Sequence, residues 1–212
     1  MYFRQFLDPD SGILSYLVAD EASRQAFIID PGPDTCQSVV LRALLDERRL
    51  QLTAILLTHI HGDSADMLGC LYPGVPLHAG AASHGRYPWA ALQDEDRIPF
   101  AGSTLRVIAT PGHTPCSMSY LWQDRLFCGH ALLPGTCSRA EDGDCDPGTL
   151  FDSVIRRLFL LPDETLVFPG QDAGGRSVST IGEERRHNPA FLARSRDVFV
   201  TAFRPYPQYP SP

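Results

Sequence analysis

Apolar and polar positions follow one another along the chain in patterns that predict strands and helices in mixed order. Residues 13–19 and 25–30 are apolar, β-prone segments separated by a polar pentapeptide, which predicts a hairpin. Across residues 34–48, apolar side chains recur at helical spacing, as in an amphipathic helix. The continuous apolar run at 52–57 has the length and the Leu/Ile content of a strand buried on both faces. The first part of the chain therefore predicts a strand-helix-strand unit.

The second part of the chain predicts more short strands and helices. The strands are expected at residues 76–79, 104–109, 118–122, 125–128 and 165–168. Helices are expected after Pro147-Gly148, at 181–186 and from Pro189. Toward the C-terminus, closely spaced prolines exclude a regular helix. We therefore expect one domain over residues 1–203 and an extended, Pro-rich tail over residues 204–212.

The composition points to small molecules as ligands. The formal net charge is −7 and no cluster of Lys and Arg is present, so nucleic acid is not expected as a partner. The chain has no apolar stretch of membrane-spanning length and no apolar region like that of a signal peptide. We expect a cytoplasmic protein that does not bind a membrane, and a homodimer is compatible with the sequence. The six cysteines form no close-spaced pairs, which favours reduced thiols.

Histidines and other polar residues come directly after several of the predicted strands. These positions carry His59 and His61, His113, His130, and Gln171 with Asp172. Neutral imidazole is the commonest nitrogen ligand of zinc and of non-haem iron. Two imidazoles two residues apart on extended backbone point to the same side, so one metal ion is able to bind both. We expect these strand ends to converge on one metal site.

Four motifs at these strand ends resemble those of a known family. They are Thr58-His59-Ile60-His61-Gly62-Asp63-Ser64, residues 110–115, residues 127–133 and residues 167–172. Together they resemble the metallo-β-lactamase superfamily and, within it, the glyoxalase II-like branch that includes persulfide dioxygenases of the ETHE1 type. The resemblance implies an α/β (α+β) fold: an αββα four-layer sandwich of two mixed sheets flanked by helices.

The chain departs from the family pattern at three positions. Ser64 stands where the pattern Thr-His-x-His-x-Asp-His has its last His, Gln171 replaces another His, and His130 replaces a metal-binding Asp. Ser64 and Gln171 fall on the second metal site of dinuclear relatives, and both are poor ligands, so we expect a mononuclear centre. The resemblance assigns its metal to His59, His113 and His130, which would form a shell of neutral imidazoles.

Two further motifs resemble the persulfide dioxygenase subgroup. Residues 177–189 are similar to its helix signature Ser-Thr-x-x-Glu-Glu-Arg-x-x-Asn-Pro, and Cys137-Ser138-Arg139 is similar to its Cys-Gly-Arg. The resemblance places Arg139 and Arg185 near a thiol substrate, with Arg185 engaging the carboxylates of glutathione. An ordinary solvated or helix-capping role is an equally weighted alternative for both arginines. Thr114 is a third expected substrate contact.

Other polar residues near the histidines are candidates for catalysis and for support of the ligands. Asp63, together with His61, is able to orient or deprotonate a metal-bound water. An equal alternative is that the Asp63 carboxylate caps the next helix along the chain. Asp172, with Gln171 beside it, is expected to support the ligands from behind by fixing the tautomer of an imidazole.

The leading hypothesis is a mononuclear non-haem iron sulfur dioxygenase with one Fe(II) per chain. It would oxidise glutathione persulfide, or a similar low-molecular-weight persulfide, with O2 to sulfite and the free thiol. Three imidazoles and a water are also a catalytic zinc arrangement, so a Zn(II)-dependent thioester hydrolase of the glyoxalase II kind is the alternative. Because three ligand positions differ from the family, a metal-depleted relative that only binds a thiol is a third hypothesis.

Overall fold

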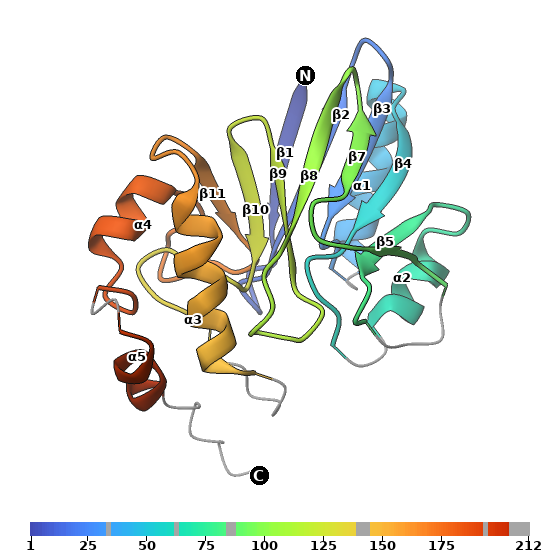
Figure 1. Cartoon of the computed structure of the whole chain (residues 1–212). Coiled ribbons are helices and arrows are strands. Elements are labelled where there is room, and N and C mark those ends of the chain that lie inside the picture. Colours follow the sequence, from blue (N-terminus) through green and yellow to red (C-terminus); the bar gives the residue numbers. More distant parts are fainter. Residues whose placement is uncertain (33–34, 62–63, 84–87, 139–144, 193–194, 204–212) are drawn as a thin grey trace.

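Two six-stranded sheets face each other, and helices cover the outer face of each sheet (Figure 1). The structure is a computed structural model, and it describes residues 1–32, 35–61, 64–83, 88–138, 145–192 and 195–203. The predicted four-layer αββα sandwich is therefore confirmed. None of the helices in these ranges combines the length and the apolar character needed to cross a bilayer.

The first sheet comes from the N-terminal part of the chain. Its strands are β1 (Tyr2–Leu7), β2 (Leu14–Asp20), β3 (Gln25–Ile29), β4 (Gln51–Leu56), β5 (Leu77–Gly80) and β6 (Ala90–Leu92), in that spatial order. The first three strands pair antiparallel, and β3 to β6 pair parallel. The parallel crossovers contain α1 (Thr35–Arg48) and α2 (Ser64–Leu71). The predicted hairpin, helix and buried strand are confirmed.

The second sheet comes from the C-terminal part. Its strands are β7 (Arg97–Phe100), β8 (Ser103–Ala109), β9 (Met118–Trp122), β10 (Arg125–Gly129), β11 (Leu166–Pro169) and β12 (Ser179–Thr180), in the order β12-β11-β10-β9-β8-β7. Strands β10 and β11 pair parallel, and α3 (Pro147–Arg156) with a short 3-10 helix (Leu158–Leu160) lies between them in the chain. The other strands of this sheet pair antiparallel with their neighbours. The C-terminal helices are α4 (Ile181–His187) and α5 (Arg196–Ala202).

Some elements differ from the sequence prediction. Strands β1, β6, β7 and β12 were not predicted; β6 and β12 are only two or three residues long, and β1 and β7 are partly exposed edge strands without a clear alternation. The helix expected from Pro189 begins instead at Arg196. Residues 188–191 form turns because the Asn188 side chain accepts a hydrogen bond from the backbone N–H of Ala190. The predicted tail lies outside the described residues.

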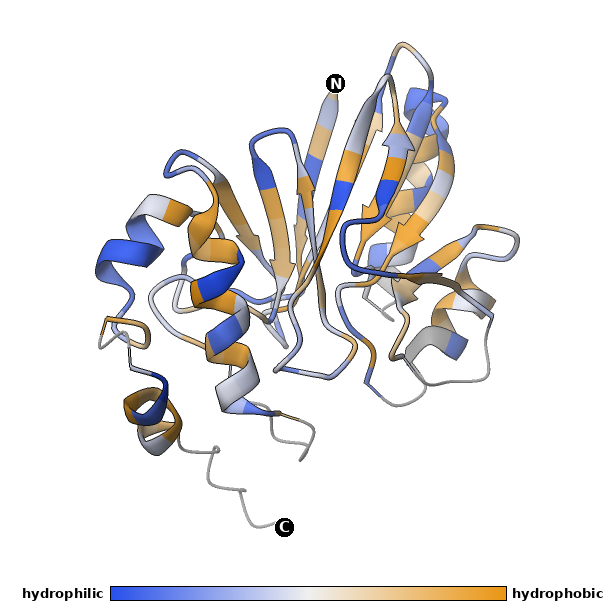
Figure 2. Ribbon diagram, in the orientation of Figure 1, coloured by the Kyte–Doolittle hydropathy of each residue, from blue (hydrophilic) through white to orange (hydrophobic). Residues whose placement is uncertain are grey.

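Buried apolar side chains form three clusters, one in each space between the four layers. Figure 2 shows that hydrophobic residues are frequent along the strands of both sheets. Strand β2 shows how one strand serves two of these spaces. Leu17 packs in the cluster beneath α1 and α2, whereas Tyr16 and Val18 pack between the sheets. Burial on both faces explains the continuous apolar runs, because such a strand has no solvent-facing side. Helices α3 and α5 cover the second sheet through Leu150 and Phe199.

Hydrogen bonds join the two sheets at the edge where β4, β8, β10 and β11 end. The N–H of Met118 donates to the Thr58 carbonyl at 2.7 Å, and the Tyr120 hydroxyl donates to the Leu57 carbonyl at 2.6 Å. At Gly129 (φ +52°) a Cβ atom would lie 2.2 Å from Oγ1 of Thr58, so only glycine permits this approach. The loops after these strands are thereby held side by side.

Candidate metal centre

A cavity of about 940 Å³ opens at this edge of the sandwich. Its lining comes from the turn before β2 and from the loops after β4, β8, β10 and β11, and residues 133–138 belong to the loop after β10. Four histidines lie in it: His59, His61, His113 and His130. The strand ends therefore converge as the sequence predicted, because the carboxyl ends of these strands lie at one edge of the two sheets (Figure 1).

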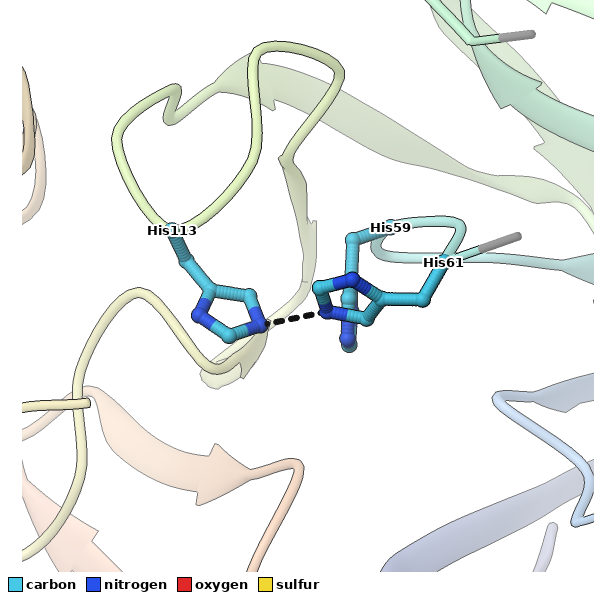
Figure 3. A group of neighbouring side chains, drawn as sticks. All are labelled: His59, His61 and His113. Carbon is cyan, nitrogen blue, oxygen red and sulfur yellow. Dashed lines mark hydrogen bonds between the residues drawn. The ribbon is translucent and has the colours of Figure 1, made fainter. Parts of the chain in front are cut away.

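The four imidazoles form one cluster. The ring centroids of His59 and His61 are 5.0 Å apart, and His113 lies 4.8 Å from His59 and 5.0 Å from His61. Figure 3 shows these three rings turned toward one another from two loops. The ring of His130 stacks on His113 at 4.7 Å and lies 4.8 Å from His59. The structure thus brings His61 into the same cluster as the three predicted ligands.

The nitrogen positions fit a bound metal ion. The ligand atoms of His59, His61 and His113 all lie within 4.8 Å of one another, and Nε2 of His61 is 3.0 Å from Nε2 of His113. Two nitrogens that bind one ion at about 2.1 Å, at a right angle, are about 3.0 Å apart. This group is therefore able to bind a metal, and its all-nitrogen donor set suits zinc, iron or another first-row ion.

Behind His59, a relay of hydrogen bonds reaches a carboxylate at the end of the neighbouring strand. Thr58 Oγ1 lies 2.9 Å from His59 Nδ1, and it donates to Asp30 at 2.6 Å. The other Asp30 oxygen accepts from the N–H of Thr58 at 2.7 Å. Because the Thr58 hydroxyl proton goes to Asp30, its oxygen accepts from His59 Nδ1, which leaves Nε2 with a lone pair for a metal.

The two histidines from the second sheet differ in their support. Nδ1 of His113 lies 2.9 Å from the Ser138 hydroxyl, and both residues are buried. Nδ1 of His130 is buried and has no hydrogen-bond partner among the described residues. A buried polar atom without a partner is uncommon in a folded protein. The His130 ring therefore lacks the support that Ser138 gives to His113.

Burial keeps three of the clustered imidazoles neutral, those of His59, His113 and His130. Desolvation, reinforced by the neighbouring histidines, lowers the pKa of His113 to about 3 and that of His130 to about 4. The same causes hold the pKa of His59 well below its ordinary value of 6.5. Desolvation also raises the pKa of the Asp30 carboxyl to about 6, against the opposing effect of its hydrogen bonds from Thr58. Neutral imidazole is the form that binds metals.

The structure brings some of the other predicted site residues to the cavity. Gln171 and Asp172 line it; the Gln171 side chain donates to the Ser11 carbonyl at 3.3 Å, and one buried Asp172 oxygen has no partner among the described residues. Within the described part of the chain, neither side chain forms a direct hydrogen bond to an imidazole. Asp63 and Arg139 lie outside the described residues.

Two predicted substrate contacts are not among the residues that line the cavity. Thr114 is buried in the turn after His113, where its hydroxyl lies 2.8 Å from that of Ser117. The guanidinium of Arg185 donates to the Phe159 carbonyl at 2.6 Å and forms an ion pair with Asp163. Both side chains bond to protein groups elsewhere, and their role as substrate contacts stays a prediction.

Asp30 and Ser138 were not predicted as site residues. A signal for Asp30 was available: it ends a buried strand, Phe27-Ile28-Ile29, just as His59 comes after the next one, and neighbouring parallel strands end at the same edge. Ser138 gave a weaker signal. It stands where the subgroup motif has Gly, and only the folded chain places its hydroxyl beside His113.

Comparison with known proteins gives relatives over nearly the whole chain. The profile of the Metallo-beta-lactamase superfamily matches residues 8–65. The mitochondrial persulfide dioxygenase ETHE1 of Bos taurus is 35% identical over 202 residues, which cover 93% of this chain and 78% of that protein. The crystal structure of ETHE1 from Myxococcus xanthus has a TM-score of 0.87 and 36% identity, covering 96% of this chain and 90% of that one.

A second enzyme class is also similar, over a shorter region. Hydroxyacylglutathione hydrolase of Edwardsiella ictaluri is 35% identical over 146 residues, which cover 68% of this chain and 55% of the hydrolase. The persulfide dioxygenases, by contrast, match over 93% of the chain. The chain belongs to the ETHE1 persulfide dioxygenase family of the metallo-β-lactamase superfamily.

Proposed function

We propose that the protein is a mononuclear iron persulfide dioxygenase that converts a low-molecular-weight persulfide, such as glutathione persulfide, and O2 to sulfite and the free thiol. The observation that carries this proposal is the cluster of four imidazoles in one cavity of a chain that belongs to the ETHE1 family. The proposed ligands are His59, His113 and His130, with His61 close enough to complete the shell.

An Fe(II) ion at this cluster would supply a redox centre with positions for both O2 and the sulfur of the substrate. The chain's own residues prepare that site. Asp30 and Thr58 on one side, and Ser138 on the other, hold the outer nitrogens of two imidazoles, so the inner nitrogens point into the cavity. The cavity is large enough for a small thiol compound and is lined by both polar and apolar groups.

The first experiment is elemental analysis and then oxygen consumption. Purified protein should contain about one iron per chain, the stoichiometry of a mononuclear site. The iron-loaded protein should consume O2 when glutathione persulfide is added, and His59→Ala should abolish this activity. His187→Ala is a matched control, because this histidine is exposed on α4, outside the cavity lining. The proposal would be wrong if the iron-loaded wild-type protein consumed no more oxygen than His59→Ala.

A zinc-dependent thioester hydrolase is the second candidate. It is favoured by the His59, His61 and His113 group, which is a three-histidine arrangement suited to catalytic zinc, and by the similarity to hydroxyacylglutathione hydrolases. Zinc in the purified protein together with hydrolysis of a glutathione thioester would favour this function. Protein that holds no metal would instead favour a thiol-binding relative without catalysis. The roles proposed for Asp63 and Arg139 and a cytoplasmic location remain predictions.

A further inference from the structure

One wall of the cavity is a single segment, Leu133–Ser138, which we call the wall loop. All six of its residues line the cavity. Its last residue, Ser138, is buried and places its hydroxyl 2.9 Å from Nδ1 of His113. The wall loop therefore touches both the space for a substrate and the back of a candidate ligand. Its position decides where the Ser138 hydroxyl lies.

Two side chains of the α4 region hold this loop by its backbone. The carboxylate of Glu184 accepts a hydrogen bond from the N–H of Gly135 at 2.8 Å. The side-chain amide of Asn188 donates to the carbonyl of Leu133 at 3.1 Å and to that of Thr136 at 2.9 Å. The same amide donates to Glu184 at 2.8 Å. Glu184 and Asn188 thus act together on three backbone groups of the loop.

The two side chains are fixed in their own right. Both are 1% exposed. A buried carboxylate is costly unless it is fully hydrogen-bonded, and Glu184 also accepts from Ser179 at 2.5 Å and lies 3.7 Å from the Arg176 guanidinium. The Asn188 oxygen accepts from the N–H of Ala190 at 3.0 Å, which fixes the direction of its amide donors. A fully satisfied buried network of this kind is rigid.

We propose that Glu184 and Asn188 are positioning residues for the metal centre: they fix the wall loop so that Ser138 accepts the Nδ1 proton of His113 and holds its Nε2 toward the cavity. The inference rests on the proposed metal-dependent function and adds residues that are not part of the cavity lining. It also gives a role to the subgroup's helix signature, in which Glu184 and Asn188 flank Arg185, whose own guanidinium bonds to Phe159 and Asp163.

The test is the affinity of metal-free protein for Co²⁺, together with the visible absorption of the bound ion. Ser138→Ala should weaken binding by roughly 10- to 100-fold, the usual effect of removing a group behind a metal-bound histidine. Ser138→Thr keeps the hydroxyl and should restore most of the affinity. Ser103→Ala is the matched control, because its hydroxyl bonds only to Phe100 and Trp122 among the bonds between described residues.

The two clamp residues, Glu184 and Asn188, are tested by Asn188→Ala and Glu184→Met, each of which should weaken Co²⁺ binding by about tenfold. Met has a similar length to Glu but no oxygen to accept the hydrogen bond from Gly135. Thr180→Ala is their control: it removes the hydroxyl that caps α4 and so weakens the same helix, without touching the wall loop. The affinity of Thr180→Ala should stay within about twofold of wild type, since the clamp contacts are kept. If Asn188→Ala does not fold, Glu184→Met decides alone.

A double variant and a tautomer measurement separate positioning from general loosening. Glu184→Met combined with Ser138→Ala should bind Co²⁺ no more weakly than Ser138→Ala alone, because the clamp acts on His113 through the Ser138 hydroxyl, which Ser138→Ala already removes. Imidazole ¹⁵N spectra of the metal-free protein should show His113 protonated at Nδ1 in wild type and a mixture of tautomers in Glu184→Met. The proposal would be overturned by a Co²⁺ affinity of Glu184→Met within about twofold of wild type, or by losses that multiply in the double variant. Oxygen consumption plays no part in this test, so the clamp and the dioxygenase function can fail separately.

Discussion

The two sheets supply the same kind of ligand but support it differently. Behind His59 from the first sheet stands a carboxylate, Asp30, which lies at the end of the adjacent strand and acts through a residue next to the ligand. His113 from the second sheet depends on Ser138, which is held in turn from α4. His130 has no partner for its outer nitrogen among the described residues. One half of the site is thus fixed locally, and the other half depends on distant parts of the chain.

This difference matters for how the site is able to change. Adjacent parallel strands fix Asp30 and Thr58 together, so the first half can hardly be altered without disturbing the sheet. Among the three proposed ligands and the groups behind them, the departures from the family motifs fall in the second half, at His130 and at Ser138. We infer that the first half, with Asp30, Thr58 and His59, keeps the metal site in place. The second half, with His113, His130 and Ser138, is where the properties of the metal site change.

Lowering the pH should have the largest effect on the stability of the metal-free protein, and it should affect the two halves of the site differently. The pKa values of His113 and His130 are lowered in the folded protein, so below about pH 6.5 the unfolded chain binds protons that the fold excludes. The free energy of unfolding of metal-free protein should therefore fall between about pH 7 and 4.5, by on the order of 2 kcal/mol for each of these two histidines. Denaturant unfolding across this pH range measures the loss.

The first half should show a partial offset. The pKa of Asp30 is raised, so this carboxyl takes up a proton more readily in the folded protein and opposes the loss caused by His59 as the pH falls. His130→Gln should therefore flatten the acid dependence of metal-free protein, because it removes a group from the half without an offset. An unchanged slope in this variant would show that His130 is not excluded from protonation in the folded state.

Removing the Thr58 hydroxyl should damage the locally fixed half. Thr58→Val keeps the shape of the side chain but removes both the support of His59 and a donor to Asp30. We expect a loss of about 1–3 kcal/mol in stability and a roughly 10- to 100-fold weaker metal affinity. Thr53→Val is the matched control on the preceding strand, because its hydroxyl bonds to the Ala26 carbonyl. Equal effects of the two variants on metal affinity would contradict this account.

Changing His130 should affect activity more than stability. His130→Asp restores the carboxylate of the family pattern, removes a buried nitrogen without a partner among the described residues, and adds a negative charge beside the other imidazoles. We expect roughly tenfold higher oxygen consumption with glutathione persulfide in iron-loaded protein. His130→Asn, which is close to Asp in size but lacks the charge, should not gain activity. Unchanged or lost activity in His130→Asp would mean that the second half of the site requires the imidazole of His130 for its activity.

Features that rest on local patterns are largely predictable from the sequence, whereas those that depend on long-range contacts are not. The buried run that becomes β4, the histidine loops and the four-layer fold were predictable, because they rest on hydrophobic pattern and family motifs. The relay from Asp30 was predictable in principle, from the order of parallel strands. The contact between Ser138 and His113, 25 residues apart, was not, since no pattern in either segment refers to the other.

The smallest expected effect comes from changing Arg185 on α4, the helix that holds the second half of the site. Its motif suggested a contact with the carboxylates of glutathione, but its guanidinium bonds to the Phe159 carbonyl and pairs with Asp163. Arg185→Ala should therefore leave the KM for glutathione persulfide within about twofold and cost roughly 1 kcal/mol in stability, the usual range for a partly exposed ion pair with one hydrogen bond. Steady-state oxygen consumption and denaturant unfolding measure the two quantities. A KM raised about tenfold with unchanged stability would instead show that Arg185 binds the substrate. Helix α4 would then contact the substrate directly, in addition to acting on the metal centre through the wall loop.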